Sequence, residues 1–263
     1  MSPRSRWLRL WLRATMRRYM AHMQDPVRLR TQMARVMARA FRPPPFSLGL
    51  PATVGGVRGL WVSNRPAADP VVLYFHGGGY FFGSAHTHRA MLSQLAQRTG
   101  LRVFAPDYRL APEHPFPAAF DDAVAVWEGL LGQGYEPGQI VLGGDSAGGG
   151  LALSLLAQLC LTDIRALILG GARPHEAGDP RLSPLYASFA SPPPVRIFAA
   201  ETEILRDDSL RMRNRLPDAE IKVSGDLPHV WPMFHDTLPE ARQTLDDTAA
   251  FIRQALALPP GGN

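Results

Sequence analysis

Residues 140–149 read Ile-Val-Leu-Gly-Gly-Asp-Ser-Ala-Gly-Gly. The apolar residues at the start of this stretch predict a strand, and the apolar residues that continue to Cys160 predict a helix opened by Ser146. Glycine at positions 144 and 148 permits the tight, strained turn that leaves a serine hydroxyl exposed between a strand and a helix. The stretch is therefore typical of a nucleophile turn, although glycine-rich turns that hold a serine also serve as plain connections.

A second glycine-rich stretch, His76-Gly77-Gly78-Gly79, follows the apolar run at 71–75. Glycines allow backbone N–H groups to approach an oxygen that becomes negative during acyl transfer. We expect Gly77, Gly78 and Ala147 to supply such oxyanion donors. The alternative is a glycine loop without a ligand, which the nucleophile turn downstream disfavours.

The last third of the chain holds candidates for a base and for an acid that orients it. His229 follows a predicted short strand, and four carboxylates follow the predicted strand at 195–199. In α/β-hydrolases the order along the chain is serine, then Asp or Glu, then histidine. His229 is therefore the candidate base, with a solvated loop histidine as the alternative. The four carboxylates are Glu201, Glu203, Asp207 and Asp208.

Strands and helices are predicted to alternate along most of the chain. The predicted strands are 60–63, 71–75, 102–105, 140–142, 166–169, 195–199 and 221–223, and the predicted helices are 86–99, 120–131, 146–160, 209–215 and 239–256. Such alternation implies a mostly parallel sheet with helices on both faces, which binds ligands at the carboxyl ends of its strands. The 263 residues, 46% of them hydrophobic, suit one α/β domain.

Five motifs in this order resemble the bacterial hormone-sensitive lipase family of esterases. They are 76–79, 107–118, 143–149, 203–208 and 228–230, within a match from about Val54 to Phe251. The resemblance implies an α/β-hydrolase fold with a helical cap, no cofactor, and activity on carboxylic esters with short or medium acyl chains.

The resemblance also assigns roles to individual residues. It implies Ser146 as nucleophile, His229 as base, Gly77, Gly78 and Ala147 as oxyanion donors, and His76 as a brace for the glycine loop. The family's acid precedes an apolar pair and an acidic doublet, which indicates Glu203, with Glu201 as the alternative. The resemblance further suggests that Asp107 and Arg109 form a buried pair. The other histidines show no spacing typical of metal ligands.

One region departs from the family. Its members insert cap helices after the strand near 166–169, whereas residues 170–180 of this chain are too rich in glycine and proline to form a long helix. We therefore expect a reduced cap made by residues 1–45, over a core domain of residues 46–263. A reduced cap leaves two outcomes open, a wide acyl pocket or a weakened site.

The positive charge is concentrated at the N-terminus. Residues 1–42 carry eleven arginines and one acid, Asp25, a net charge of +10, although the whole chain carries only +5. Helical spacing of apolar residues predicts two amphipathic helices there, the second beginning at Pro26. We expect both to pack over the active site. The alternative for the first is contact with an anionic membrane surface, and nucleic acid is not expected because no binding motif accompanies the charge.

Other features narrow the class of protein. Arginines interrupt every candidate core of a secretory signal, and no run approaches the roughly 20 apolar residues that span a bilayer. Cys160 is the only cysteine, so no intrachain disulfide forms and a cytoplasmic location is expected. We predict a cofactor-free serine carboxylesterase, a monomer or homodimer. The alternatives are a hydrolase of amides or lactones and a non-catalytic binder of small molecules.

Overall fold

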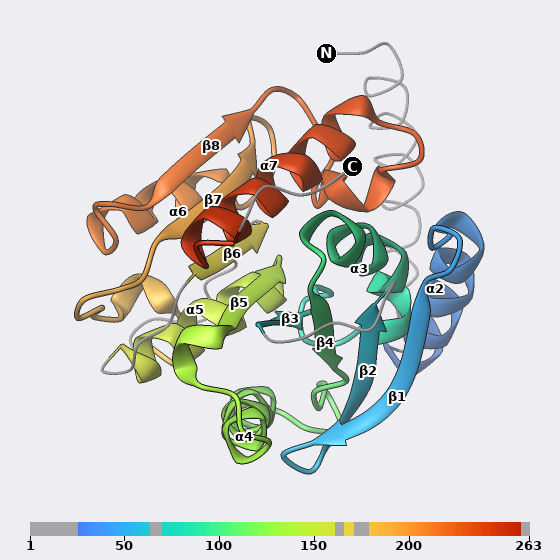
Figure 1. Cartoon of the computed structure of the whole chain (residues 1–263), viewed down its shortest axis with the longest axis horizontal. Coiled ribbons are helices and arrows are strands. Elements are labelled where there is room, and N and C mark those ends of the chain that lie inside the picture. Colours follow the sequence, from blue (N-terminus) through green and yellow to red (C-terminus); the bar gives the residue numbers. More distant parts are fainter. Residues whose placement is uncertain (1–25, 64–69, 161–165, 171–178, 259–263) are drawn as a thin grey trace.

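The computed structural model of the chain describes residues 26–63, 70–160, 166–170 and 179–258. Within them, eight strands form one twisted sheet in the order β1-β2-β4-β3-β5-β6-β7-β8 (Figure 1). The strands are β1 (Leu48–Val54), β2 (Val57–Ser63), β3 (Val71–Phe75), β4 (Arg102–Pro106), β5 (Ile140–Asp145), β6 (Ala166–Gly170), β7 (Val195–Ala200) and β8 (Glu220–Ser224). From β4 to β8 all neighbours pair in parallel, whereas β2 is antiparallel to both β1 and β4. The predicted α/β-hydrolase fold with a mostly parallel sheet is confirmed.

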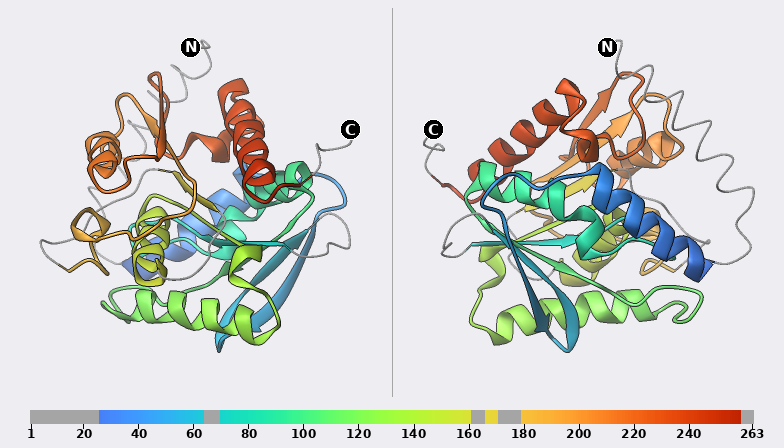
Figure 2. Two further views of the ribbon diagram at one scale, coloured as in Figure 1. Left: turned by 60° about the vertical axis from the view of Figure 1, so that its left-hand side comes forward. Right: turned by 90° about the vertical axis from the view of Figure 1, so that its right-hand side faces the viewer.

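Helices cover both faces of the sheet (Figure 2). The helices are α2 (Pro26–Ala40), α3 (Ala85–Thr99), α4 (Ala118–Gly132), α5 (Ala147–Leu159), α6 (Arg206–Arg211) and α7 (Pro239–Ala255), and 3₁₀-helices lie at 137–139, 184–186, 212–214 and 231–234. Helices α3 and α7 pack together over one face, and α4 and α5 over the other. Every residue of β3 and of β5 is buried, as expected for parallel strands with helices on both sides.

The hairpin of β1 and β2 was not predicted, because only 60–63 was expected as a strand there. Strand β1 contains Gly49 and Pro51, which disfavour a central strand but are tolerated at the edge of a sheet. Gly55 and Gly56 join the two strands with φ of 57° and 80°, the left-handed conformation that a two-residue hairpin turn requires.

The second N-terminal helix begins at Pro26 as predicted and lies beside α3. Met37 and Phe41 pack on the core under α3 and α7, and the Phe41 ring meets the Phe234 ring edge to face at 5.4 Å. The first predicted helix and most of the predicted loop at 170–180 lie outside the described residues. In the part of the chain that is described, no helix is both long and apolar enough to cross a membrane.

Candidate active site

Ser146 lies in the turn between β5 and α5, at φ 51° and ψ −122°. This is a strained conformation for a residue with a side chain. The flanking glycines are required by close backbone contacts. A Cβ atom on Gly144 would lie 2.3 Å from the Gly148 carbonyl oxygen, and one on Gly148 would lie 2.1 Å from the Phe75 carbonyl oxygen. The turn therefore presents Ser146 at the carboxyl edge of the sheet, with the end of β3 against it.

Two further loops at the same edge bring an acid and a base together. Glu203 follows β7 and His229 follows β8. The Nδ1–H of His229 donates to Oε2 of Glu203 at 2.7 Å, which leaves Nε2 of His229 as the acceptor. Oε1 of Glu203 accepts the backbone N–H of Ala200 at 3.0 Å. The Glu203 side chain is 1% exposed and that of His229 is 34% exposed, so the acid is enclosed and the base is accessible.

The other carboxylates of this region have other partners. Glu201, the alternative acid, is exposed and its backbone N–H bonds to the Ser224 carbonyl oxygen. Asp207 and Asp208 lie in the first turn of α6, where Asp208 pairs with Arg211 at 3.2 Å. The structure therefore brings Glu203, among these carboxylates, to His229.

The loop that carries His229 is held by α7. Trp231 is buried, and its indole N–H donates to Oγ1 of Thr244 in α7 at 2.9 Å. Val230, between His229 and Trp231 in the chain, adopts φ 54°, which is an uncommon conformation for a β-branched residue. A cavity of about 50 Å³ is bordered by Asp145, Glu203 and Trp231 among others, so the end of β5 and the two acid–base loops border the same cavity.

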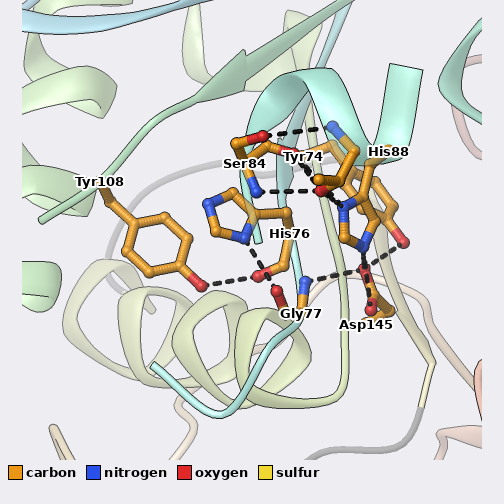
Figure 3. A network of polar contacts seen from close by, with 8 residues as sticks. Tyr74, His76, Gly77, Ser84, His88, Tyr108 and Asp145 are labelled. Carbon is orange, nitrogen blue, oxygen red and sulfur yellow. Dashed lines mark hydrogen bonds and ion pairs between the residues drawn. The ribbon is translucent and has the colours of Figure 1, made fainter. Parts of the chain in front are cut away.

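The glycine loop is held from three sides (Figure 3). The N–H of Gly77 donates to Oδ1 of Asp145 at 3.0 Å, the hydroxyl of Tyr108 donates to the His76 carbonyl oxygen at 2.6 Å, and His76 Nδ1 contacts the Gly77 carbonyl oxygen at 2.8 Å. The His76 ring stacks on Tyr108 with centroids 4.3 Å apart. His76 is thus a brace rather than a reacting group.

This geometry corrects the expectation for Gly77. Its N–H was expected to donate to an oxyanion, but it already bonds to Asp145. A Cβ atom on Gly77 would lie 2.1 Å from Oδ2 of Asp145, so this glycine is required by close approach to a carboxylate. Over the described residues, the N–H groups of Gly78, Gly79 and Ala147 form no hydrogen bond. Gly77 was assigned wrongly because sequence patterns do not indicate the direction in which a loop amide points.

Asp145 is a residue at the site that sequence reasoning did not single out. It is 3% exposed and accepts hydrogen bonds from Gly77 and from the hydroxyl of Tyr74, at 3.1 Å. His88 Nε2 lies 3.2 Å from Oδ1 of Asp145 and 3.4 Å from Oδ2. Burial alone raises the pKa of Asp145, but the charge of His88, the hydrogen bond from His88, and the contacts with His76 and Tyr74 outweigh burial and hold this pKa below its usual range. The one signal that the sequence offered for this residue was an acid directly before the serine.

The two histidines near the loop differ in their surroundings. Burial, and after it the charge of His88, lower the pKa of His76 from 6.5 to about 3, so His76 is neutral at physiological pH. His88 contacts Asp145 through Nε2 and Oγ1 of Thr87 through Nδ1, at 2.9 Å. No group of three or more His, Cys, Asp and Glu residues suited to a metal ion occurs in the described ranges.

The segment 107–118 is attached to α3 and α4, by different pairs from those expected. Arg109 pairs with Asp122 of α4 at 2.8 Å, while Oδ1 of Asp107 accepts the Ala85 N–H at 2.7 Å, so the predicted Asp107–Arg109 pair is wrong. Asp107 instead binds the backbone N–H of the first residue of α3.

Helix α2 is tied to the segment after the glycine loop by one side chain. The guanidinium of Arg30 donates to the carbonyl oxygens of Phe81 and Ala111 and forms two hydrogen bonds with Glu113, at 2.9 and 3.0 Å. This pairing with Arg30 lowers the pKa of Glu113. Arg30 therefore joins the N-terminal region to the candidate active site.

The chain is similar to known proteins over most of its length. Residues 72–172 match a protein family described as the alpha/beta hydrolase fold. An esterase from Acinetobacter venetianus is 35% identical, over 76% of this chain and 80% of the relative. An acetyl-hydrolase from Streptomyces hygroscopicus is 34% identical, over 80% of this chain and 85% of the relative. The crystal structure of an esterase from the bacterial hormone-sensitive lipase family has a TM-score of 0.89 and 31% identity, and covers 97% of this chain and 99% of that one.

Proposed function

Because the chain belongs to the hormone-sensitive lipase family of α/β-hydrolase esterases, we propose that Ser146, Glu203 and His229 form its catalytic triad. The protein is a carboxylic ester hydrolase, and hydrolases of this fold react through an acyl-enzyme. The observation that carries the assignment of the triad is the 2.7 Å contact between His229 and Glu203, at the same sheet edge as the strained Ser146.

The contact between His229 and Glu203 supports the following reaction cycle. Nε2 of His229 takes the hydroxyl proton of Ser146 as Oγ attacks the ester carbonyl carbon, and Glu203 stabilises the imidazolium. His229 then gives that proton to the leaving alcohol oxygen as its bond to carbon breaks. Water, deprotonated by His229, releases the acid from Ser146 in the second half-reaction.

The oxyanion of both half-reactions is bound by the unused amides of the glycine loop and of α5. Gly78, Gly79 and Ala147 are these donors, and Gly79 takes the place that the sequence assigned to Gly77. Losing one donor of this kind typically lowers kcat by about 10²–10³-fold.

The proposed triad is tested by rapid-mixing kinetics with p-nitrophenyl acetate. Parent enzyme should release a burst of p-nitrophenol equivalent to one alcohol per active site, followed by a slower steady state. Ser146→Ala should show neither burst nor steady turnover, because no acyl-enzyme forms. Ser146→Ala that turns over like the parent would overturn the assignment.

The preferred substrates are esters with short or medium acyl chains. The acetyl-hydrolase from Streptomyces hygroscopicus supports a small acyl group by its name. A p-nitrophenyl ester series from acetate to palmitate should give its highest kcat/KM at or below the decanoate, and a maximum at palmitate would contradict this. Matching anilides and lactones separate esters from the other substrates that the sequence left open.

The second part of the proposal is that the basic N-terminal segment contacts anionic membrane surfaces, which the sequence left open for its first predicted helix. Helix α2 exposes Val27 and Val36 beside Arg35 and Arg39, and basic amphipathic helices of this kind bind anionic headgroups. In a sedimentation assay at low salt, the full chain should pellet with vesicles of phosphatidylglycerol and phosphatidylcholine. It should stay in the supernatant with vesicles of pure phosphatidylcholine. Equal binding to both vesicles would contradict this part.

The location and the oligomeric state complete the proposal. The lone Cys160 favours the cytoplasm, and light scattering should find a monomer or a homodimer.

A further inference from the structure

The side chain of Asp145 extends the pairing of β3 and β5 beyond the point where their backbones separate. The last backbone pair in this ladder is Phe75 with Gly144. One residue later on β5, Oδ1 of Asp145 accepts the N–H of Gly77, at 3.0 Å. The carboxylate therefore takes the place of the carbonyl oxygen that a longer strand would have offered.

Asp145 is also the residue directly before Ser146. Its backbone ends the strand that carries the nucleophile, and its side chain holds the loop that carries Gly78 and Gly79. The two backbones are in contact on the other side as well, where Gly148 lies against Phe75. The Asp145 carboxylate is thus one of the contacts that set the separation between the nucleophile and the donors of the glycine loop.

Two elements fix the orientation of this carboxylate. Tyr74 of β3 donates to Oδ1, and Nε2 of His88 of α3 lies within 3.4 Å of both oxygens. His88 is held in turn by Thr87, whose hydroxyl accepts the Ser84 N–H in the capping box of α3. A buried carboxylate with this many donors has a single arrangement, and oxyanion donors need such preorganisation to stabilise charge.

From this geometry we infer that Asp145 is a positioning residue, whose carboxylate locks the oxyanion loop onto the nucleophile turn while Tyr74 and His88 hold the carboxylate in place. The inference rests on the proposed catalytic role of Ser146. Asp145 touches no reacting atom, so its effect falls on stabilisation of the transition state and not on binding of the ester.

The test compares kcat, KM and the affinity for a trifluoromethyl ketone, whose adduct with a serine carries an oxyanion. Asp145→Ala removes the acceptor of the Gly77 N–H and should lower kcat and ketone affinity in parallel, each by about 10²-fold, with KM within threefold of the parent. Asp145→Asn keeps an oxygen for Gly77 and should recover both quantities to within tenfold of the parent. Tyr74→Phe should lower both by three- to tenfold.

Asp122→Ala is the matched control, because Asp122 is also a buried carboxylate that accepts a backbone N–H, that of Arg109, at 2.7 Å. It should lower the melting temperature and leave kcat and ketone affinity within threefold of the parent. If Asp145→Ala does not fold, Tyr74→Phe becomes the deciding variant. A loss below threefold in both kcat and ketone affinity of Tyr74→Phe would then overturn the inference.

The Ser146→Ala variant distinguishes a failure of this inference from a failure of the proposed triad. If Ser146→Ala is inactive while a folded Asp145→Ala keeps kcat and ketone affinity within threefold of the parent, this inference is wrong and the triad stands. The inference also fails if Asp145→Asn is as impaired as Asp145→Ala, since the oxygen that accepts the Gly77 N–H is then not what matters. If Ser146→Ala retains turnover, the proposed triad is wrong and the inference falls with it.

Discussion

The glycine-loop side of the candidate active site, around Gly77 and Asp145, is buried and has many partners, whereas on the acid–base side the His229 ring is partly exposed and bonds to Glu203. His76, His88 and Asp145 are all at most 3% exposed, while the His229 side chain is 34% exposed. Oxyanion donors act best when they do not move, but a base must exchange a proton with substrate and water. The difference shows how one sheet edge provides both a fixed side and an accessible side.

The largest expected effect is on the acid–base side. His229→Ala should lower kcat by at least about 10⁴-fold, as removal of a triad base does in other serine hydrolases. The melting temperature should stay within a few degrees of the parent, since few contacts depend on the accessible ring. Steady-state kinetics and calorimetry measure the two quantities, and a large loss of stability would show that His229 also supports the fold.

The glycine-loop side should respond in the opposite way, by losing stability. Gly77→Ala places a Cβ atom 2.1 Å from Oδ2 of Asp145 and 2.9 Å from its carbonyl oxygen. Overpacking of this kind costs about 1–3 kcal/mol of the free energy of unfolding. Gly132→Ala, at the end of α4, meets no atom within 4 Å and should be neutral or stabilising. Urea unfolding of both variants tests the contrast, which equal destabilisation would contradict.

Acid should weaken the buried side through His76. The folded chain holds the pKa of His76 at about 3 against 6.5 for a free imidazole, so between these values the unfolded chain binds a proton that the folded chain does not. The free energy of unfolding should therefore fall as the pH drops below 6.5, with a contribution of about 2 kcal/mol from His76 by pH 5. His76→Gln should lose less stability than the parent from pH 7 to pH 5. An unchanged difference would mean that His76 is not the group that titrates.

The smallest effect is expected at Arg30, which joins α2 to the buried side from outside. Arg30 is 27% exposed and Glu113 39% exposed, so solvent screens the pair. Arg30→Ala should lower the free energy of unfolding by about 1 kcal/mol and change kcat by less than threefold. Arg35→Ala, at an exposed position of the same helix, is the control. A tenfold loss of kcat in Arg30→Ala alone would show that the glycine loop depends on α2.

The fold and the turn at Ser146 could be predicted because their signals are local. A strand, a Gly-x-Ser-x-Gly turn and a helix are adjacent in the sequence, and the glycines at 144 and 148 report the close packing directly. The acid needed the family pattern to separate Glu203 from Glu201, since four carboxylates follow β7 closely in the sequence.

The remainder was not predictable for physical reasons. Tyr74, His88 and Asp145 meet across 57 to 71 residues of chain, and no local pattern records such a contact. The direction of the Gly77 amide depends on that contact as well. Strand β1 was missed because its proline and glycine are acceptable only at an edge, and the position of a strand in a sheet is a property of the whole fold.

The central claim is that Ser146 is the nucleophile, and covalent labelling tests it most directly. Parent enzyme and Ser146→Ala are treated with a fluorophosphonate, and the modified peptide is identified by mass spectrometry. The account predicts one label per chain, on Ser146, and none in the variant. A label on another residue, or an active parent enzyme that takes no label, would contradict it.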